Sequence, residues 1–83
     1  MTPYRFAVDV MPRDGILDPQ GRAVEASLPQ LGAEAVSEVR VGRRVELTVQ
    51  APDAAQAREM VERLAADFLA NPLVEKWSIE ALR

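Results

Sequence analysis

The segment YRFAVDVMP (residues 4–12) alternates two sets of side chains along its whole length. One set is apolar and consists of Tyr4, Phe6, Val8 and Val10. A repeat of two residues is typical of a β-strand that buries one face. Pro12 has no amide hydrogen to give to a sheet, so we expect the strand to end there. This segment predicts a sheet, and the remaining chain must supply further strands and the helices that cover one face.

A helix is predicted to follow this strand. Asp18 suits the N-cap, because its carboxylate can accept a backbone N–H, and Pro19 suits the first helical position. One stripe of this helix is apolar and consists of Val24, Leu28 and Leu31. Gly32 would end the helix in a left-handed conformation, and Pro29 predicts a kink or a short, tight last turn.

Gly21 is not explained by helix capping. A glycine in the first turn of a helix costs up to about 1 kcal/mol relative to alanine. Glycine is tolerated where another backbone must come close, since it has no Cβ. We therefore expect a second segment or a partner to pack closely against Gly21.

Two strands are predicted within residues 36–49, VSEVRVGRRVELTV. Val39 and Val41 share a buried face with the later apolar residues only if the connecting loop has an odd number of residues. A three-residue loop over residues 42–44 satisfies this condition. A two-residue turn at residues 42–43 also fits if a bulge restores the faces.

The second helix is the clearest one. Asp53 and Gln56 have the spacing of a capping box. Its apolar stripe consists of Ala57, Met60, Val61, Leu64, Ala65 and Phe68. Asn71 should end the helix because the residue before a proline avoids helical geometry. A last strand is predicted over residues 74–82.

The predicted order is β-α-β-β-α-β, in one domain of residues 1–83. This is the ferredoxin-like α+β arrangement, in which two helices pack on one face of a four-stranded antiparallel sheet. A chain of this size buries only a thin core. With no cysteine for disulfides, we expect oligomerisation or docking on a larger partner to supply the missing stability.

Composition excludes several functions. The net charge is −3, whereas nucleic-acid binding depends on clustered lysine and arginine. No stretch has the length of a membrane span or the layout of a signal peptide, so we expect a cytoplasmic protein. Without histidine or cysteine, neither zinc ligation nor Ser-His or Cys-His catalysis is available. No glycine-rich phosphate loop is present, and we expect no catalytic residue, metal or cofactor in this chain.

One basic spot interrupts the acidic chain at Arg40, Arg43 and Arg44, on the tip of the predicted hairpin. Charged residues at such a tip can simply deter aggregation of sheet edges. Alternatively, the planar guanidinium groups suit a phosphate or an acidic partner surface.

Four pieces of sequence resemble the PurS subunit family of phosphoribosylformylglycinamidine synthase, in order and at the family's spacing. They are LDPQG (17–21), LG (31–32), VRVGR (39–43) and LANPLVE (69–75). The resemblance spans nearly the whole chain. One departure is Arg43, where lysine is usual in such proteins.

This resemblance implies a small subunit without catalytic groups in de novo purine synthesis. In that family a glutaminase subunit releases ammonia, and a large synthetase subunit uses ATP and magnesium to activate the amide oxygen of formylglycinamide ribonucleotide. Ammonia then displaces phosphate to give the amidine. The small subunit forms a homodimer or homotetramer and helps to bring the two larger subunits together.

Six residues within the matching motifs are our candidates for partner contacts: Asp18, Gly21, Arg40, Arg43, Asn71 and Glu75. An alternative remains from the same predicted fold. Regulatory domains of the ACT type share the β-α-β-β-α-β order and bind small molecules near a glycine after the first strand, and Gly15 or Gly21 fits that description.

Overall fold

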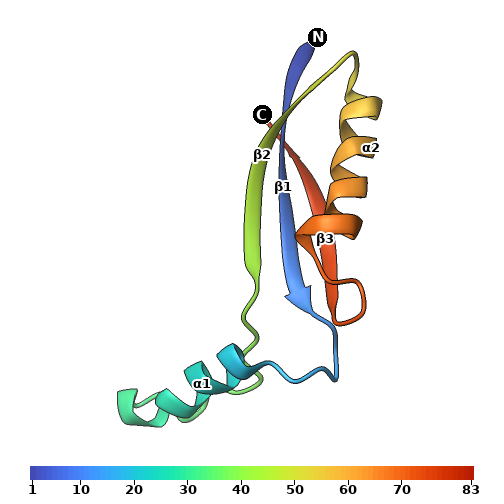
Figure 1. Cartoon of the computed structure of the whole chain (residues 1–83). Coiled ribbons are helices and arrows are strands. Elements are labelled where there is room, and N and C mark those ends of the chain that lie inside the picture. Colours follow the sequence, from blue (N-terminus) through green and yellow to red (C-terminus); the bar gives the residue numbers. More distant parts are fainter.

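The sheet has three antiparallel strands, with the N-terminal strand in the middle (Figure 1). The computed structural model describes all 83 residues. β1 (Thr2–Pro12) lies between β2 (Arg43–Ala51) and β3 (Glu75–Leu82). Both outer strands pair with β1 over most of its length, so β1 is the only strand without a free edge.

Two helices connect the strands. α1 (Pro19–Ser27) and a 3₁₀ turn (Pro29–Leu31) follow β1. α2 (Ala54–Leu64) follows β2 and continues into a π-helical turn (Ala65–Leu69). Neither helix has the length and hydrophobicity that a membrane-spanning helix requires.

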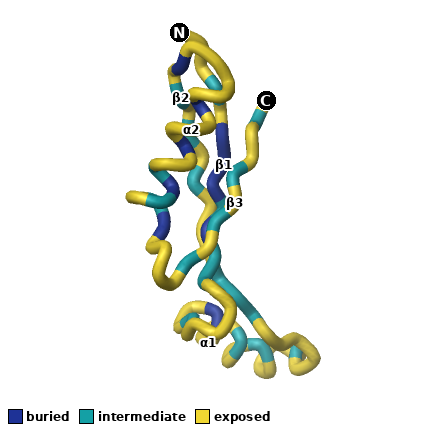
Figure 2. The backbone as a smooth tube through the Cα atoms, turned by 90° about the vertical axis from the view of Figure 1, so that its right-hand side faces the viewer, coloured by how far each residue is buried: buried dark blue, intermediate teal, exposed yellow.

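The core lies between α2 and one face of the sheet. On the helix, Ala57, Val61 and Ala65 are fully buried. They face Val8 and Val10 of β1, which are also fully buried. Figure 2 shows the buried positions concentrated on β1 and α2. Because the helix presents mainly alanines, it can approach the sheet closely, and the core contains few large side chains.

The predicted fourth strand is absent, so the expectation of a four-stranded sheet was wrong. Residues 37–42 lie between α1 and β2 without pairing to either outer strand. Glu38 has a φ of 57°, which an extended strand cannot accommodate. The amides of Val39 and Val41 donate to the carboxylates of Glu25 and Asp18 instead of to a neighbouring strand. The valines do alternate as they would in a strand. Their backbone amides, however, are satisfied by side chains of the first helix and its N-cap, so no neighbouring strand is needed.

The expectation of two helices on one face was also wrong, because α1 does not cover the sheet. Residues 13–42, which we call the arm, project from one end of the sheet (Figure 1). The stripe that should have packed on the sheet is exposed, with Leu31 77% accessible. The chain is elongated as a result, at 52 × 27 × 14 Å. Its radius of gyration is 16.4 Å, against about 12 Å for a compact domain of this length.

The hairpin predicted around Gly42 does not form, since its first strand is missing. Arg43 and Arg44 are the first residues of β2 and pair with Val10 and Asp9 of β1. A Cβ on Gly42 would collide with Met11 and the carbonyl of Val10. The glycine is therefore needed where the arm returns across the end of β1, and not for a hairpin turn.

The predicted stripe of α2 is confirmed as buried at Ala57, Val61 and Ala65, and it is wrong for Met60 and Phe68. The π-helical turn holds one extra residue, shown by the hydrogen bond from Ala70 N to Ala65 O at 3.0 Å. The extra residue rotates Phe68 outward, where it is 80% accessible, and brings Leu69 against the core. Met60 is exposed as well, at 39%.

The N-caps predicted at Asp18 and Asp53 are confirmed, but only one half of the predicted capping box forms. Asp53 accepts a hydrogen bond from Gln56 N at 2.8 Å, although the Gln56 side chain returns to the carboxylate and not to the backbone. At the end of the first helix, Pro29 opens a tight 3₁₀ turn and Gly32 has a left-handed φ of 75°.

Candidate partner-contact site

Asp18 joins the start of the arm to its end. It is the N-cap of α1, where Oδ1 accepts from Gly21 N at 3.0 Å. Its second oxygen, Oδ2, accepts from Val41 N at 2.8 Å. These backbone hydrogen bonds lower the pKa of Asp18 below its usual value, and the bond from Val41 has the larger effect. One carboxylate therefore caps the helix and holds the returning chain against it.

Gly21 lies where the backbone of the returning segment comes close to α1. It is the only buried residue of the arm. A Cβ at this position would collide with the Asp18 carboxylate and the Val39 carbonyl oxygen. The close packing expected at Gly21 is thus present, and the second segment is the chain's own residues 39–41.

Arg40 fastens the returning segment to the end of β1. Its Nη2 donates to the carbonyl oxygens of Pro12 at 2.5 Å and Arg13 at 2.9 Å. Its Nη1 lies 3.4 Å from Asp14 Oδ1. The pKa of Asp14 is lowered, mainly by the positive charge of Lys76 and to a smaller extent by that of Arg40. The Nε of Arg40 is buried and has no partner.

Arg43 fastens the start of β2 to the loop before β3. Its guanidinium donates to Glu75 Oε2 at 2.7 Å and Oε1 at 3.1 Å, and also to the carbonyl of Leu69. Asn71 N donates to Glu75 Oε1 at 2.7 Å, and Asn71 Oδ1 accepts from Leu73 N at 3.1 Å. Hydrogen bonds from Arg43 and the Asn71 amide lower the pKa of Glu75, and the same ion pair raises the pKa of Arg43. The LANPLVE motif is therefore a loop closed around one ion pair.

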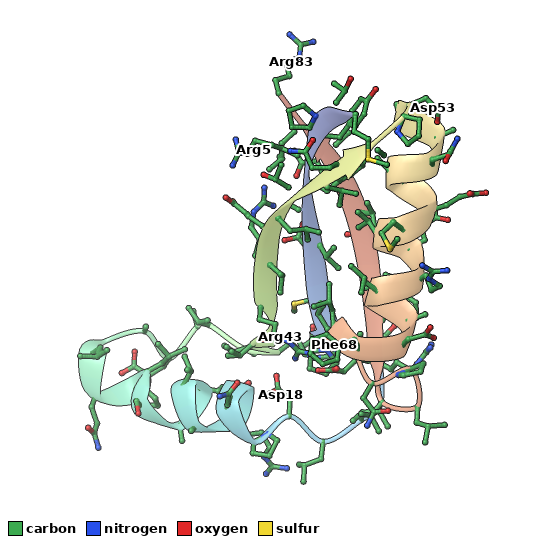
Figure 3. The ribbon with its side chains drawn as sticks, turned by 45° about the horizontal axis from the view of Figure 1, so that its top comes forward. Arg5, Asp18, Arg43, Asp53, Phe68 and Arg83 are labelled. Carbon is green, nitrogen blue, oxygen red and sulfur yellow. The ribbon has the colours of Figure 1, made fainter.

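These contacts meet at a groove between the arm and the end of the sheet. The groove has a volume of about 610 Å³. It is lined by Pro12, Ile16, Leu17, Asp18, Pro19, Gln20, Val41, Gly42, Arg43, Val74 and Glu75. Asp18 and Arg43 both lie at this junction in Figure 3. Three of the six predicted residues, Asp18, Arg43 and Glu75, line the groove. The other three, Gly21, Arg40 and Asn71, do not line it, but each is hydrogen-bonded to a residue that does.

The three arginines do not form one cationic patch. Arg40 is bound to the carbonyl oxygens of Pro12 and Arg13 at the end of β1, and Arg43 is paired with Glu75. Arg44 points to the other face of the sheet, because neighbouring residues of a strand alternate. It binds three carboxylates on the three strands there, those of Asp9, Glu46 and Glu80, at 3.1–3.3 Å. A phosphate that bound Arg44 would have to displace these carboxylates. The carboxylates themselves are not arranged as a metal site, since no group of three or more acidic side chains in the chain could hold a metal ion.

Sequence reasoning missed two residues of the junction. Arg13 donates its backbone amide to Val74 O at 2.9 Å and its Nε to Pro72 O at 3.0 Å. Glu25 accepts from Val39 N at 3.1 Å. A signal existed for Glu25, which lies four residues after Gly21 and so on the same side of the helix. No local signal pointed to Arg13.

We expect acid to weaken the hydrogen bonds that Asp18 and Glu75 accept at the junction of the arm and the sheet. Asp18 and Glu75 have lowered pKa values, so their contribution to stability is present above the ordinary carboxylate range and is lost as pH falls below about 4. We expect the amides of residues 18–41 to exchange faster between pH 4 and 3 while β1 stays protected, after correction for the intrinsic pH dependence of exchange. A double variant Asp18→Asn, Glu75→Gln should show fast exchange at both pH values. Equal loss of protection in β1 would contradict a local effect.

Comparison with known proteins assigns this chain to a family. The family model of PurS, phosphoribosylformylglycinamidine (FGAM) synthase, matches residues 5–83. This chain belongs to the PurS family. It is a PurS-type subunit of phosphoribosylformylglycinamidine synthase, an enzyme of purine biosynthesis.

Individual PurS proteins agree with this assignment. Subunit PurS of Synechocystis is 40% identical over 77 residues, which are 93% of this chain and 77% of that protein. A chain in the structure of PurLQS from Thermotoga maritima superposes with a TM-score of 0.88 at 32% identity, covering 99% of this chain and 100% of that one. PurS of Thermus thermophilus gives 0.80 at 38% identity, covering 99% and 100%. Since the alignments span nearly all of this chain, the PurS likeness includes the arm as well as the sheet.

Proposed function

We propose that this chain is a non-catalytic PurS subunit that brings the glutaminase (PurQ) and synthetase (PurL) subunits of the synthase together. The observation that carries the proposal is the likeness to the chain within PurLQS of Thermotoga maritima, over the full length of both chains. Family membership also favours this function over an ACT-like sensor of small molecules. The site of action would be the cytoplasm, in keeping with the absence of cysteine.

The chemistry of the site supports a positioning role. Each charged side chain of the groove already has partners within the chain: Asp18 binds two backbone amides, and Arg43 binds Glu75. A carboxylate engaged in this way is a poor general base, since its pKa is lowered away from neutrality. ATP and magnesium would be used by the synthetase subunit alone. This chain would contribute by holding two active sites in a fixed relation, which limits the escape of ammonia to water.

We further propose that the chain acts as a homodimer or homotetramer. One helix covers a face that the ferredoxin-like arrangement covers with two, and Tyr4, Val45, Leu47 and Val49 on that face remain partly accessible. The arm adds exposed apolar side chains, and the whole chain is far from compact. A small domain of this shape gains stability when a second copy covers such surfaces.

The proposal predicts activity only in the assembled enzyme. The purified chain should turn over neither glutamine nor ATP, and it should co-elute with the glutaminase and synthetase subunits in size-exclusion chromatography. Glutamine-dependent amidation should require all three proteins, whereas ammonia-dependent amidation by the synthetase should persist without this chain. Turnover by the chain alone, or tight calorimetric binding of an amino acid to it, would contradict the proposal.

A further inference from the structure

A second cavity lies at the end of the sheet opposite to the arm, where Figure 3 shows Arg5 and Arg83. It has a volume of about 500 Å³. Three arginines line it, Arg5, Arg58 and Arg83, and no acidic residue does. The other lining residues include apolar side chains such as Tyr4 and Leu82. In a chain with a net charge of −3, this cavity, which we call the arginine pocket, is a local cationic site with apolar walls.

The guanidinium groups of the arginine pocket have donors to spare. Arg5 and Arg58 each have a single ion pair, of 3.7 and 3.3 Å, and Arg83 has none. Arg43 and Arg44, by contrast, each donate to two or more acceptors within the chain. Planar guanidinium groups with free donors bind carboxylates through two parallel hydrogen bonds. The arginine pocket is thus suited to an acidic ligand.

The arginine pocket lies beside an unpaired edge of β1. The last residue of β3, Leu82, pairs with Arg5, whereas β1 extends to Thr2. Residues 2–4 therefore have β2 on one side and an open edge on the other. An extended segment can add to such an edge and place its side chains in neighbouring pockets. The open edge and the free guanidinium groups together favour an extended acidic segment of a protein as the ligand.

The proposed association of copies of this chain leaves the arginine pocket accessible. The surfaces that we assign to a second copy are the arm and the accessible apolar side chains on the helix-covered face of β1 and β2. The arm projects from the other end of the sheet (Figure 1). Arg58 lies on the side of α2 that faces β3, beside Trp77 and Ile79. Tyr4 is the only residue that belongs to both surfaces, so the pocket is available to a subunit of another kind.

We propose that the arginine pocket binds an extended acidic segment of the glutaminase subunit. This inference rests on the proposed function and names the surface that recruits one of its two partners. Ten residues line the pocket, fewer than the about 20–30 that each side of a stable interface contributes. A contact of this size suits a subunit that joins an existing assembly. In the proposed function the chain is required only when glutamine is the nitrogen donor, so the glutaminase is the partner that it must recruit.

Titration of the glutaminase against a fixed amount of the synthetase and this chain tests the proposal. In the double variant Arg5→Gln, Arg58→Gln, the glutaminase concentration that gives half-maximal glutamine-dependent activity should rise by about tenfold or more, because hydrogen bonds between charged groups are lost. The maximal rate at saturating glutaminase should stay near the wild-type value. Arg63→Gln is the matched control, since it removes an exposed arginine of the same helix that does not line the pocket.

Salt provides a second measurement on the same proteins. Raising the ionic strength from about 50 to about 200 mM should increase the half-maximal glutaminase concentration of the wild type several-fold, because salt screens exposed charges. The double variant lacks two of these charges, so its response to salt should be smaller. Arg63→Gln should respond as the wild type does.

A further pair of variants fills the cavity without removing charge. Ala54 lines the arginine pocket, whereas the neighbouring Ala55 does not. Ala54→Phe should therefore raise the half-maximal glutaminase concentration about as much as the double variant does. Ala55→Phe makes the same change on the same helix and should leave this concentration near the wild-type value.

Several outcomes would overturn the proposal. One is a double variant that recruits the glutaminase as well as the wild type does, and another is a double variant that loses affinity for the synthetase instead. A changed oligomeric state in size-exclusion chromatography would make the pocket a contact between copies. Calorimetric binding of a small anion such as citrate to the wild-type chain, lost in the double variant, would assign the pocket to a free ligand. If glutamine-dependent amidation does not require the wild-type chain at all, the proposed function itself is overturned.

Discussion

Gly21→Ala should reduce the glutamine-dependent activity of the assembled synthase by at least about tenfold. In most helices this substitution is favourable by up to about 1 kcal/mol. Here the new Cβ would collide with the Asp18 carboxylate and the Val39 carbonyl oxygen. To relieve the collision, residues 39–41 must move away from α1, which breaks the bond from Val41 N to Asp18. Steady-state assays of the reconstituted enzyme, with glutamine and then with ammonia as the nitrogen donor, measure the effect.

Two controls accompany this variant. Ammonia-dependent activity should not change, because the substitution lies outside the synthetase. Arg22→Ala places the same side chain one residue later, at an exposed position of α1, and should leave both activities near wild type. If Gly21→Ala raises the melting temperature and keeps full glutamine-dependent activity, then Gly21 is an ordinary helix glycine and the junction has no role in assembly.

Ala57→Leu should lower the melting temperature of the chain by about 10 °C. Ala57 is fully buried where α2 meets the sheet, and a leucine there must force the helix away from β1 and β2. Adding such volume to a packed core costs about 1–3 kcal/mol. In a domain of this size each kcal/mol shifts the melting temperature by about 4–8 °C. Thermal unfolding followed by circular dichroism gives the result.

Ala55→Leu is the matched control for this second variant. It makes the same change two residues earlier, on the exposed side of α2, where we expect a shift below about 2 °C. A tolerated leucine at position 57 would mean that the α2 interface can repack, contrary to the close approach that the buried alanines indicate. The pair thus measures how much of the stability depends on having a small side chain at the buried positions of this helix.

Sequence alone predicted the elements that bury one face along their whole length. β1, β3 and most of α2 follow from strict repeats of two or 3.6 residues, and these repeats reflect burial directly. The alternation at Val39 and Val41 failed because it describes side chains, whereas the structure is decided there by backbone amides that bind Asp18 and Glu25. Such bonds link residues far apart in sequence, and no local pattern reports them.

The candidate site was predictable as a set of residues, and its geometry was not. Asp18 was identified as a helix cap, and a close neighbour was expected at Gly21. The identity of that neighbour depends on where the chain returns after α1, which the sequence left open. Likewise, the pairing of Arg43 with Glu75 joins two motifs that are separate in sequence. Whether these residues also contact the other subunits remains a prediction for the assembly experiments.

The central place of β1 also determines the order in which this protein can fold. Phe6 pairs with Leu47 and with Ala81, so β1 cannot complete its two ladders until β2 and then β3 have been synthesised. Pairings this distant in sequence slow folding, because a long loop must close before any contact forms. Until β2, α2 and β3 are available, the apolar face of β1 is incompletely covered and open to aggregation. We therefore expect the three-stranded sheet to form only after β3 has left the ribosome, which would make its yield in cells sensitive to chaperones.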